Sequence, residues 1–307
     1  MRRIKIKFSD GKIRRVPFIS PMRPEGILEA PEGNWVAEEK KDGSLTLMYL
    51  EDGAVAYVNR RGVNKTLVYP EMVISPKNYR NKKLTIIQGE AYVGRGGKDS
   101  FENFLKRDLL KNPIEAKIRS KKYPLEFDAF DIQMAEGELL NKEPLLSRKK
   151  VLKEKLPKHS RVHYTKFFKD YKKRASELKK DKTVEGVVFK HLPDGYKSGR
   201  SDEWRKLKFT KEADVVVVGY NKGDGRRSDI GALRAGVYDK RSKKIREVAN
   251  VGVGFSDKDI ADYKKRLDKG EKIFGKVQYL KVGSQGRLRA PVWIGERKDI
   301  TIKETGL

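Results

Sequence analysis

The chain has 307 residues, enough for one large or two ordinary domains, and carries a formal net charge of +28 from 71 Lys and Arg against 43 Asp and Glu. Because such an imbalance costs self-repulsion, it favours a polyanionic partner, most simply nucleic acid, over a generally charged, heat-adapted surface. The sequence has no cysteine, no apolar run of about 18 residues and no apolar signal-peptide core, which excludes thiolate chemistry and predicts an intracellular, cytoplasmic protein without membrane contact.

The first 210 residues contain short apolar or alternating runs separated by glycine- and proline-marked turns, a pattern typical of strands. Strands are predicted at residues 4–8, 13–18, 35–37, 45–50, 54–58, 85–87, 125–132, 184–190 and 204–209. Helices are predicted at residues 99–119, with a break near Pro113, and at residues 147–155. Residues 21–26 and the glycine-rich stretch 94–98 are expected to be loops, and the basic stretch 158–182 to be partly helical.

The pattern of apolar runs and glycines changes after residue 210. Glycine-punctuated strands are predicted at residues 214–220, 232–238 and 248–255, followed by a helix at 256–269 and a final strand at 277–282. Such a succession favours a small β-barrel such as an OB-fold. The predicted fold class is therefore α+β, with antiparallel sheets and flanking helices in a domain at residues 1–209 and an all-β OB-fold domain at residues 210–307.

A lysine lies on the tight loop between two predicted strands, in the tetrapeptide Lys40-Lys41-Asp42-Gly43. Desolvation of this loop and the adjacent cation of Lys41 both favour a neutral ε-amine at Lys40, and a neutral amine is a nucleophile. Taken alone, the tetrapeptide is also compatible with a solvated turn.

The loop resembles the nucleophile motif Lys-x-Asp-Gly of the covalent nucleotidyltransferases, which comprise ATP-dependent DNA ligases, RNA ligases and mRNA capping enzymes. Further stretches follow in an order similar to that of ATP-dependent DNA ligases, and they cover nearly the whole chain. They are residues 59–62 (Asn-Arg-Arg-Gly), 89–90 (Gly-Glu), 130–132 (Phe-Asp-Ile), 143–145 (Glu-Pro-Leu) with Arg148, 185–190 (Glu-Gly-Val-Val-Phe-Lys), 204–208 (Trp-Arg-Lys-Leu-Lys), 231–238 and 286–291. The ordered set resembles the compact two-domain type of these ligases, with an adenylation domain followed by an OB-fold.

The resemblance implies a nucleotide site. Lys40 would be the catalytic nucleophile that forms a lysyl–AMP from ATP and releases pyrophosphate. The residues implied to bind the nucleotide are Glu38, which selects adenine, Phe130, which stacks on it, Arg60 and Lys190, the phosphate-binding Lys206 and Lys208, and Arg297, which orients the pyrophosphate. Glu90 and Glu185 would contact ribose or bind Mg²⁺, with Mn²⁺ as a substitute, because hard cations take oxygen ligands.

The resemblance also implies a DNA-binding surface. The residues expected to contact nicked duplex DNA are Arg60, Arg61, Lys222, Arg226, Arg227, Arg287 and Arg289. Screened phosphate contacts of this kind make binding strongly salt-dependent. We expect a monomer that seals nicks between a 5′-phosphate and a 3′-hydroxyl through an adenylated DNA end.

Four departures from the ligase pattern leave alternatives open. Leu45 stands where DNA ligases commonly have arginine, which resembles some RNA ligases, and Asn59 and Gln88 replace the usual serine and aspartate. The C-terminal motif is present only as residues 297–300 (Arg-Lys-Asp-Ile), without its terminal lysine unless Lys303 substitutes for it. An ATP-dependent RNA ligase and a non-catalytic nucleic-acid clamp are therefore alternatives, and a capping enzyme would require GTP.

Overall fold

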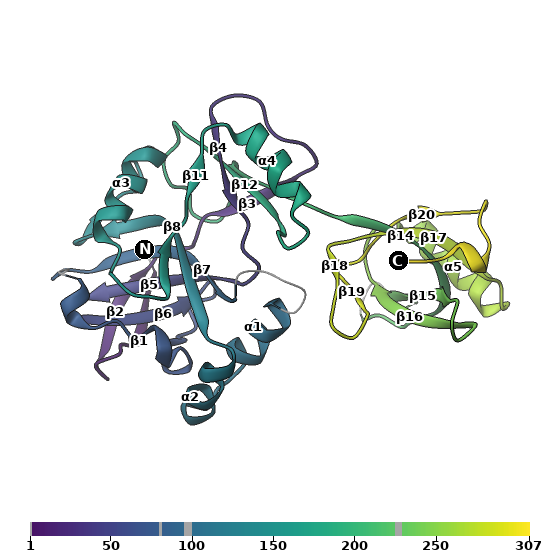
Figure 1. The fold of residues 1–307 in the computed structure, drawn as a ribbon, viewed down its shortest axis with the longest axis horizontal. Coiled ribbons are helices and arrows are strands. Elements are labelled where there is room, and N and C mark those ends of the chain that lie inside the picture. The colour runs from purple at the N-terminus through teal and green to yellow at the C-terminus, as the bar shows by residue number, and fades with distance from the viewer. Residues whose placement is uncertain (1, 80–81, 95–99, 225–228) are drawn as a thin grey trace. The chain divides into compact units, whose positions relative to one another are not determined.

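The computed structural model describes residues 2–79, 82–94, 100–224 and 229–307, and it divides into two compact units, Met1–Lys208 and Phe209–Leu307 (Figure 1).

Two sheets and a hairpin make up the strands of the first unit (Figure 1). The larger sheet has the order β10-β8-β7-β5-β6, with β9 paired to β8, and consists of β5 (Ser44–Glu51), β6 (Ala54–Asn59), β7 (Thr85–Val93), β8 (Leu125–Ala135), β9 (Glu138–Leu139) and β10 (Val162–Tyr164). The second sheet has the order β11-β4-β12-β13-β3 and consists of β3 (Arg23–Ile27), β4 (Trp35–Glu39), β11 (Phe167–Phe168), β12 (Gly186–His191) and β13 (Arg200–Lys208). The hairpin is β1 (Arg2–Lys7) and β2 (Ile13–Phe18).

The helices of the first unit are α1 (Ser100–Asp108), α2 (Pro113–Lys122), α3 (Leu145–Lys155) and α4 (Tyr171–Lys180), with 3₁₀ turns at Thr66–Val68, Pro70–Met72 and Pro76–Asn78. Both faces of the larger sheet are covered, so β5 and β7 are buried along most of their length. Helix α1 packs on one face of this sheet, where Phe104 and Phe127 lie in the core. The other is covered by the N-terminal hairpin, which contributes Ile6 and Phe8.

One local prediction is confirmed and two differ from the structure. The break predicted near Pro113 separates α1 from α2, because Asn112 Oδ1 caps α2 by accepting a hydrogen bond from Ile114 N at 2.8 Å and Pro113 occupies the first turn. Residues 21–26, predicted as a loop, contain most of β3, which pairs in parallel with β13. The basic stretch 158–182 contains β10 and β11 before its helix, α4.

The second unit is built on one five-stranded antiparallel sheet with the order β16-β15-β14-β17-β20 (Figure 1). Its elements are β14 (Lys211–Asn221), β15 (Ala232–Asp239), β16 (Lys244–Val251), α5 (Asp257–Asp268), β17 (Ile273–Tyr279), β18 (Lys281–Val282), β19 (Leu288–Arg289), β20 (Val292–Glu296) and a 3₁₀ turn at Ile302–Glu304. Ser256 starts α5 with a capping box to Asp259. The strand predicted as final is followed by β19 and β20, and β20 adds the edge of the sheet beside β17.

Antiparallel pairing dominates both units and the helices are few, so the predicted α+β class is confirmed. No helix in the described part of the chain is both long enough and apolar enough to cross a membrane.

Candidate active site

Strand register places two rows of polar side chains in the first unit. In the second sheet, Glu38 of β4 lies opposite Val188 of β12, and Val188 lies opposite Lys206 of β13. Directly opposed residues point to the same face of a sheet, so Glu38 and Lys206 share one face. In the larger sheet the corresponding row is formed by Glu90 of β7 and Asp128 of β8.

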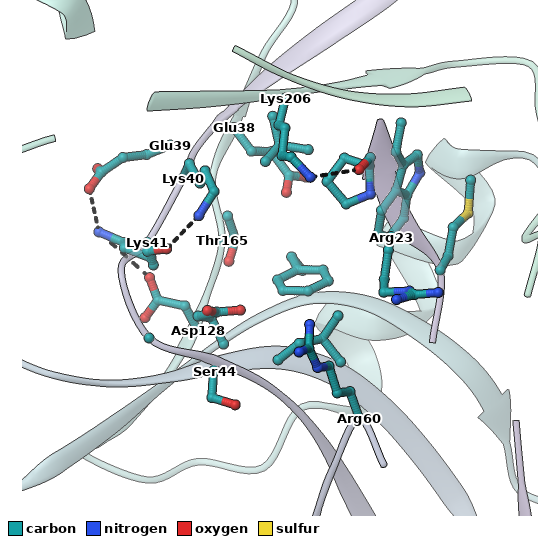
Figure 2. Close-up of a pocket in the computed structure, with 18 of the residues that line it drawn as sticks. Arg23, Glu38, Glu39, Lys40, Lys41, Ser44, Arg60, Asp128, Thr165 and Lys206 are labelled. Atoms are coloured by element: carbon teal, nitrogen blue, oxygen red, sulfur yellow. Dashed lines mark hydrogen bonds and ion pairs between the residues drawn. The ribbon is translucent and has the colours of Figure 1, made fainter. Parts of the chain in front are cut away.

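These rows line a pocket of about 420 Å³ (Figure 2). The residues predicted for the nucleotide that line it are Glu38, Lys40, Arg60, Glu90, Phe130, Lys190 and Lys206. Other residues that no motif had singled out also line it, among them Arg23, Asp128 and Thr165. Glu185 and Lys208 do not line this pocket, but Glu185 contacts Lys40 beside it.

The Lys40 loop continues the sheet and then packs tightly against the other sheet. Lys40 N donates a hydrogen bond to Gly186 O at 2.9 Å, which extends the β4–β12 ladder. A Cβ at Gly43 would lie 2.0 Å from the carbonyl oxygen of Ala91, so only glycine permits this approach. The glycine of the motif therefore fixes where the lysine leaves the strand.

The amine of Lys40 is ion-paired, which differs from the neutral amine expected from the sequence. Its Nζ lies 2.6 Å from Glu185 Oε2, and Lys208 Nζ lies 3.8 Å from the other oxygen of Glu185. Lys41, expected to repel it, is itself balanced by Glu39 at 2.9 Å and Asp128 at 3.8 Å. Lys40 Nζ therefore has to move away from Glu185 before it can attack another atom.

Glu38 is held between two lysines at the buried end of the pocket. Lys190 Nζ lies 2.8 Å from Glu38 Oε2, and Lys149 Nζ contacts Oε1. Lys190 also donates to Phe130 O at 2.9 Å. Burial lowers the pKa of Lys190 to about 8, with Glu38 opposing the shift and Lys149 adding to it. Lys149 was missed because its position beside Arg148 on α3 carries no motif of its own.

Carboxylate crowding near Lys40 suits a bound cation. Desolvation raises the pKa of Glu90 to about 8, with Lys40 opposing the shift and Glu185 and Asp42 adding to it. Among the residues that the structure describes, no three carboxylate or histidine side chains form a cluster able to hold a metal. Since Mg²⁺ is usually held by one or two carboxylates together with substrate phosphates and water, this donor set fits a Mg²⁺ that arrives with a nucleotide.

An aromatic wall completes the pocket. Phe130 is half-buried, and its ring meets the ring of Trp204 edge to face at 5.9 Å. Lys190 Nζ lies 4.6 Å from the centre of the Phe130 ring and 4.1 Å from that of Trp204. An apolar wall beside fixed cations is the arrangement that a purine nucleotide requires.

Lys206 of β13 lines the pocket and is oriented by a main-chain contact. Lys206 Nζ donates a hydrogen bond to Pro24 O at 3.0 Å. Desolvation lowers the pKa of Lys206, and the nearby cations of Lys208 and Lys40 lower it further. A polyanion entering the pocket would relieve this repulsion.

The turn after β6 presents two of the predicted DNA-binding residues. Arg60 and Arg61 are both exposed, and Arg60 also lines the pocket. Asn59 Oδ1 accepts hydrogen bonds from Arg61 N and Val63 N at 3.0 Å each. Asn59 therefore closes the turn through its side chain, as a serine in its place would also do.

The remaining predicted residues belong to the second unit. Lys222 and Arg287 are exposed and Arg289 is half-buried, whereas Arg226 and Arg227 lie outside the described residues. Arg297 donates two 2.6 Å hydrogen bonds to Asp299 and one of 3.2 Å to Asp214. Lys303 is exposed. The guanidinium of Arg297 is thus hydrogen-bonded to carboxylates of its own unit.

Comparison with known proteins identifies the family. The family model described as the ATP dependent DNA ligase domain matches residues 20–208. A DNA ligase of Thermococcus fumicolans is 32% identical over 82% of this chain and 48% of its own length, and a probable DNA ligase of Dictyoglomus turgidum is 28% identical over 86% of this chain and 48% of its own length. The chain thus spans about half the length of these curated relatives.

Solved structures share the fold. A structure from a study of Lig E DNA ligases has a TM-score of 0.62 and 19% identity, covering 89% of this chain and 99% of that one. A mycobacterial DNA ligase D complexed with ATP and MES has a TM-score of 0.50 and 21% identity, covering 94% of this chain and 98% of that one. These likenesses agree with the predicted adenylation and OB-fold architecture. The matched domain, which covers more than half of the chain, places it in the family of ATP-dependent DNA ligases.

Proposed function

We propose that the chain is an ATP-dependent DNA ligase that joins a 5′-phosphate to a 3′-hydroxyl at a nick in duplex DNA. The observation that carries this proposal is the position of Lys40, whose amine lies 2.6 Å from Glu185 at a pocket of about 420 Å³ with an aromatic wall and further lysines. Curated relatives that are 32% identical to this chain are named as DNA ligases, which disfavours the RNA ligase alternative.

The first step loads the enzyme. Lys40 Nζ attacks the α-phosphorus of ATP, an N–P bond forms, the bond from that phosphorus to the bridging oxygen breaks, and pyrophosphate leaves with its electron pair. The amine gives up its proton in this step. Glu185, the carboxylate nearest to Nζ, is the group that can hold that proton or release Lys40 when the phosphates arrive.

Charge neutralisation is shared by the side chains around the phosphates. Lys206 and Lys208 offset the negative charge on the α-phosphate as it is attacked. Glu90 and Glu185 would hold Mg²⁺, or Mn²⁺, together with phosphate oxygens, and the cation would supply further positive charge there. Phe130 stacks on the adenine ring and Arg60 contacts ribose or the DNA 5′-phosphate.

Two further steps complete the cycle. A 5′-phosphate oxygen of the nick attacks the phosphorus of lysyl–AMP, the P–N bond breaks and the amine recovers a proton. The 3′-hydroxyl then attacks the adenylated 5′-phosphate and AMP departs. The net charge of +28 suits a monomer that grips duplex phosphates, with Arg61 beside the pocket and Lys222, Arg287 and Arg289 in the second unit as contacts.

The test uses ATP labelled in its α-phosphate, with Mg²⁺, on the native protein and on Lys40→Arg, which keeps the positive charge. We expect covalent label on the native protein, none on the variant, and sealing of a nicked DNA duplex by the native protein alone. A native protein that never gains the mass of AMP, or a labelled Lys40→Arg, contradicts the proposal. Sealing of RNA ends in preference to nicked DNA would instead favour the RNA ligase.

A further inference from the structure

The buried end of the pocket contains a hydroxyl group that the steps above do not use. Thr165 lines the pocket and is only 7% exposed. Within the described part of the chain, its Oγ1 has no hydrogen-bond partner. Figure 2 draws it among the side chains that line the pocket. A buried hydroxyl without a partner is unfavourable, so a ligand that forms a hydrogen bond with it gains that interaction.

The backbone of Thr165 is fixed from both sides. Thr165 lies between β10 of the larger sheet and β11 of the second sheet. Its N–H donates to Ala129 O at 2.9 Å, next to Phe130, and its carbonyl accepts from Lys149 Nζ at 3.4 Å. The hydroxyl is therefore held near the aromatic wall by main-chain contacts rather than by its own side chain.

The carboxylate of Glu38 is also held in place. Lys149 contacts Oε1 of Glu38 while Lys190 lies 2.8 Å from Oε2, and Phe167 of β11 is directly opposite Glu38 in the sheet. A carboxylate accepts hydrogen bonds only, whereas a threonine hydroxyl can also donate one. Thr165 and Glu38 both contact Lys149 and both line the pocket, so its buried end offers a donor and an acceptor on residues joined by one lysine.

We infer that Thr165 is a specificity-determining residue that donates a hydrogen bond to a ring nitrogen of adenine while Glu38 accepts one from the exocyclic amino group. Adenine offers this donor and acceptor along one edge. Guanine presents an acceptor oxygen where adenine has its amino group, and that oxygen would face the carboxylate. This inference deepens the proposed function and rests on it for the identity of the nucleotide.

The experiment measures nucleotide binding rather than transfer. Affinities for ATP and GTP are determined by titration calorimetry without divalent cations, on the native protein, Thr165→Val, Thr165→Ser and the control Thr210→Val, whose threonine is exposed and does not line the pocket. Valine keeps the branched shape and removes the hydroxyl. We expect Thr165→Val to bind ATP about 5- to 10-fold more weakly with GTP unchanged, and Thr165→Ser and the control to match the native protein.

Two analogues locate the bond. 1-Deaza-ATP and 7-deaza-ATP each lack one ring nitrogen, and one of them should bind the native protein as weakly as ATP binds Thr165→Val, with no further loss when analogue and variant are combined. Equal losses for ATP and GTP, or native ATP affinity in Thr165→Val, overturn the inference. If the affinities follow the expectation but no label reaches Lys40, the proposed function fails and the inference stands. If Lys40 is labelled but Thr165→Val binds ATP like the native protein, the inference fails and the proposed function stands.

Discussion

Two ion pairs in the first unit show how differently a buried charge can be used. Lys40 of the pair Lys40–Glu185 lines the pocket, whereas neither residue of the pair Asp131–Arg148 does. Asp131 and Arg148 are both 0% exposed, and the guanidinium makes bonds of 2.9 and 3.0 Å to the carboxylate and donates to two carbonyl oxygens. Lys40 and Glu185 share one 2.6 Å contact and keep 20% and 8% of their side chains exposed. A pair whose bonding capacity is used up serves the fold, whereas a pair with capacity left can exchange partners.

The largest effect should come from breaking the saturated pair. Asp131→Ala leaves Arg148 buried without its partner, and we expect a loss of about 3–5 kcal/mol in the free energy of unfolding, measured by urea denaturation. The matched control is Asp10→Ala, which breaks the more exposed pair with Arg14 and should cost at most about 1 kcal/mol. Similar losses for the two variants would remove the contrast between the pairs.

The open pair should affect chemistry more than stability. Glu185→Gln keeps the shape of the side chain but removes the charge opposite Lys40, and we expect the rate of lysine labelling by ATP to fall about 10²- to 10³-fold. The free energy of unfolding should change far less than in Asp131→Ala. A normal labelling rate together with a large loss of stability would assign Glu185 to the fold instead.

A smaller effect should follow from displacing the loop that carries the lysine. Gly43→Ala places a Cβ against the Ala91 carbonyl, and we expect a loss of about 1–3 kcal/mol in stability together with slower labelling. Gly26→Ala is the control, since a Cβ there meets nothing within 4 Å. Thermal melts and labelling time courses on both variants test this, and native behaviour of Gly43→Ala would show that the loop adapts freely.

The last effect, confined to the pH range between the two pKa values, should come from Glu90. Its pKa is raised from 4.5 to about 8 by desolvation, so between these values the unfolded chain ionises while the folded protein does not. The contribution of Glu90 to the free energy of unfolding is therefore fully present below pH 4.5 and is lost as the pH rises toward 8. Glu90→Gln should therefore gain stability relative to the native protein from pH 5 to pH 8 and keep a constant difference above it. A difference independent of pH in melts without nucleotide or divalent cations would contradict this.

The sequence was sufficient for most of the longer strands and for the residues whose motifs are contiguous. Lys40 and Gly43 are neighbours in the chain, and alternation along β13 was enough to put Lys206 and Lys208 on one side. Long-range pairing was out of reach. Thr165 joins the pocket because short strands before and after it belong to different sheets, and a three-residue and a two-residue strand leave no periodic signal in a basic stretch.

The partners of charged residues were equally hard to foresee. Lys41 was expected to repel Lys40, but β7–β8 register brings Asp128 beside it, and such register depends on the whole sheet. Arg297 was chosen from an incomplete motif, and its guanidinium is engaged by Asp299 and Asp214. Which charge neutralises which is decided by tertiary structure.

The contact between Lys40 and Glu185 has a consequence for the idle protein. Lys40 Nζ lies 2.6 Å from Glu185 Oε2, and an amine engaged in such a contact is less available to the acylating and carbonyl compounds that modify free amines. Under the proposed function, the phosphates of an incoming nucleotide would compete with Glu185 for the lysine. The nucleotide would then free the same amine that it modifies, and the salt bridge would protect that amine in the meantime.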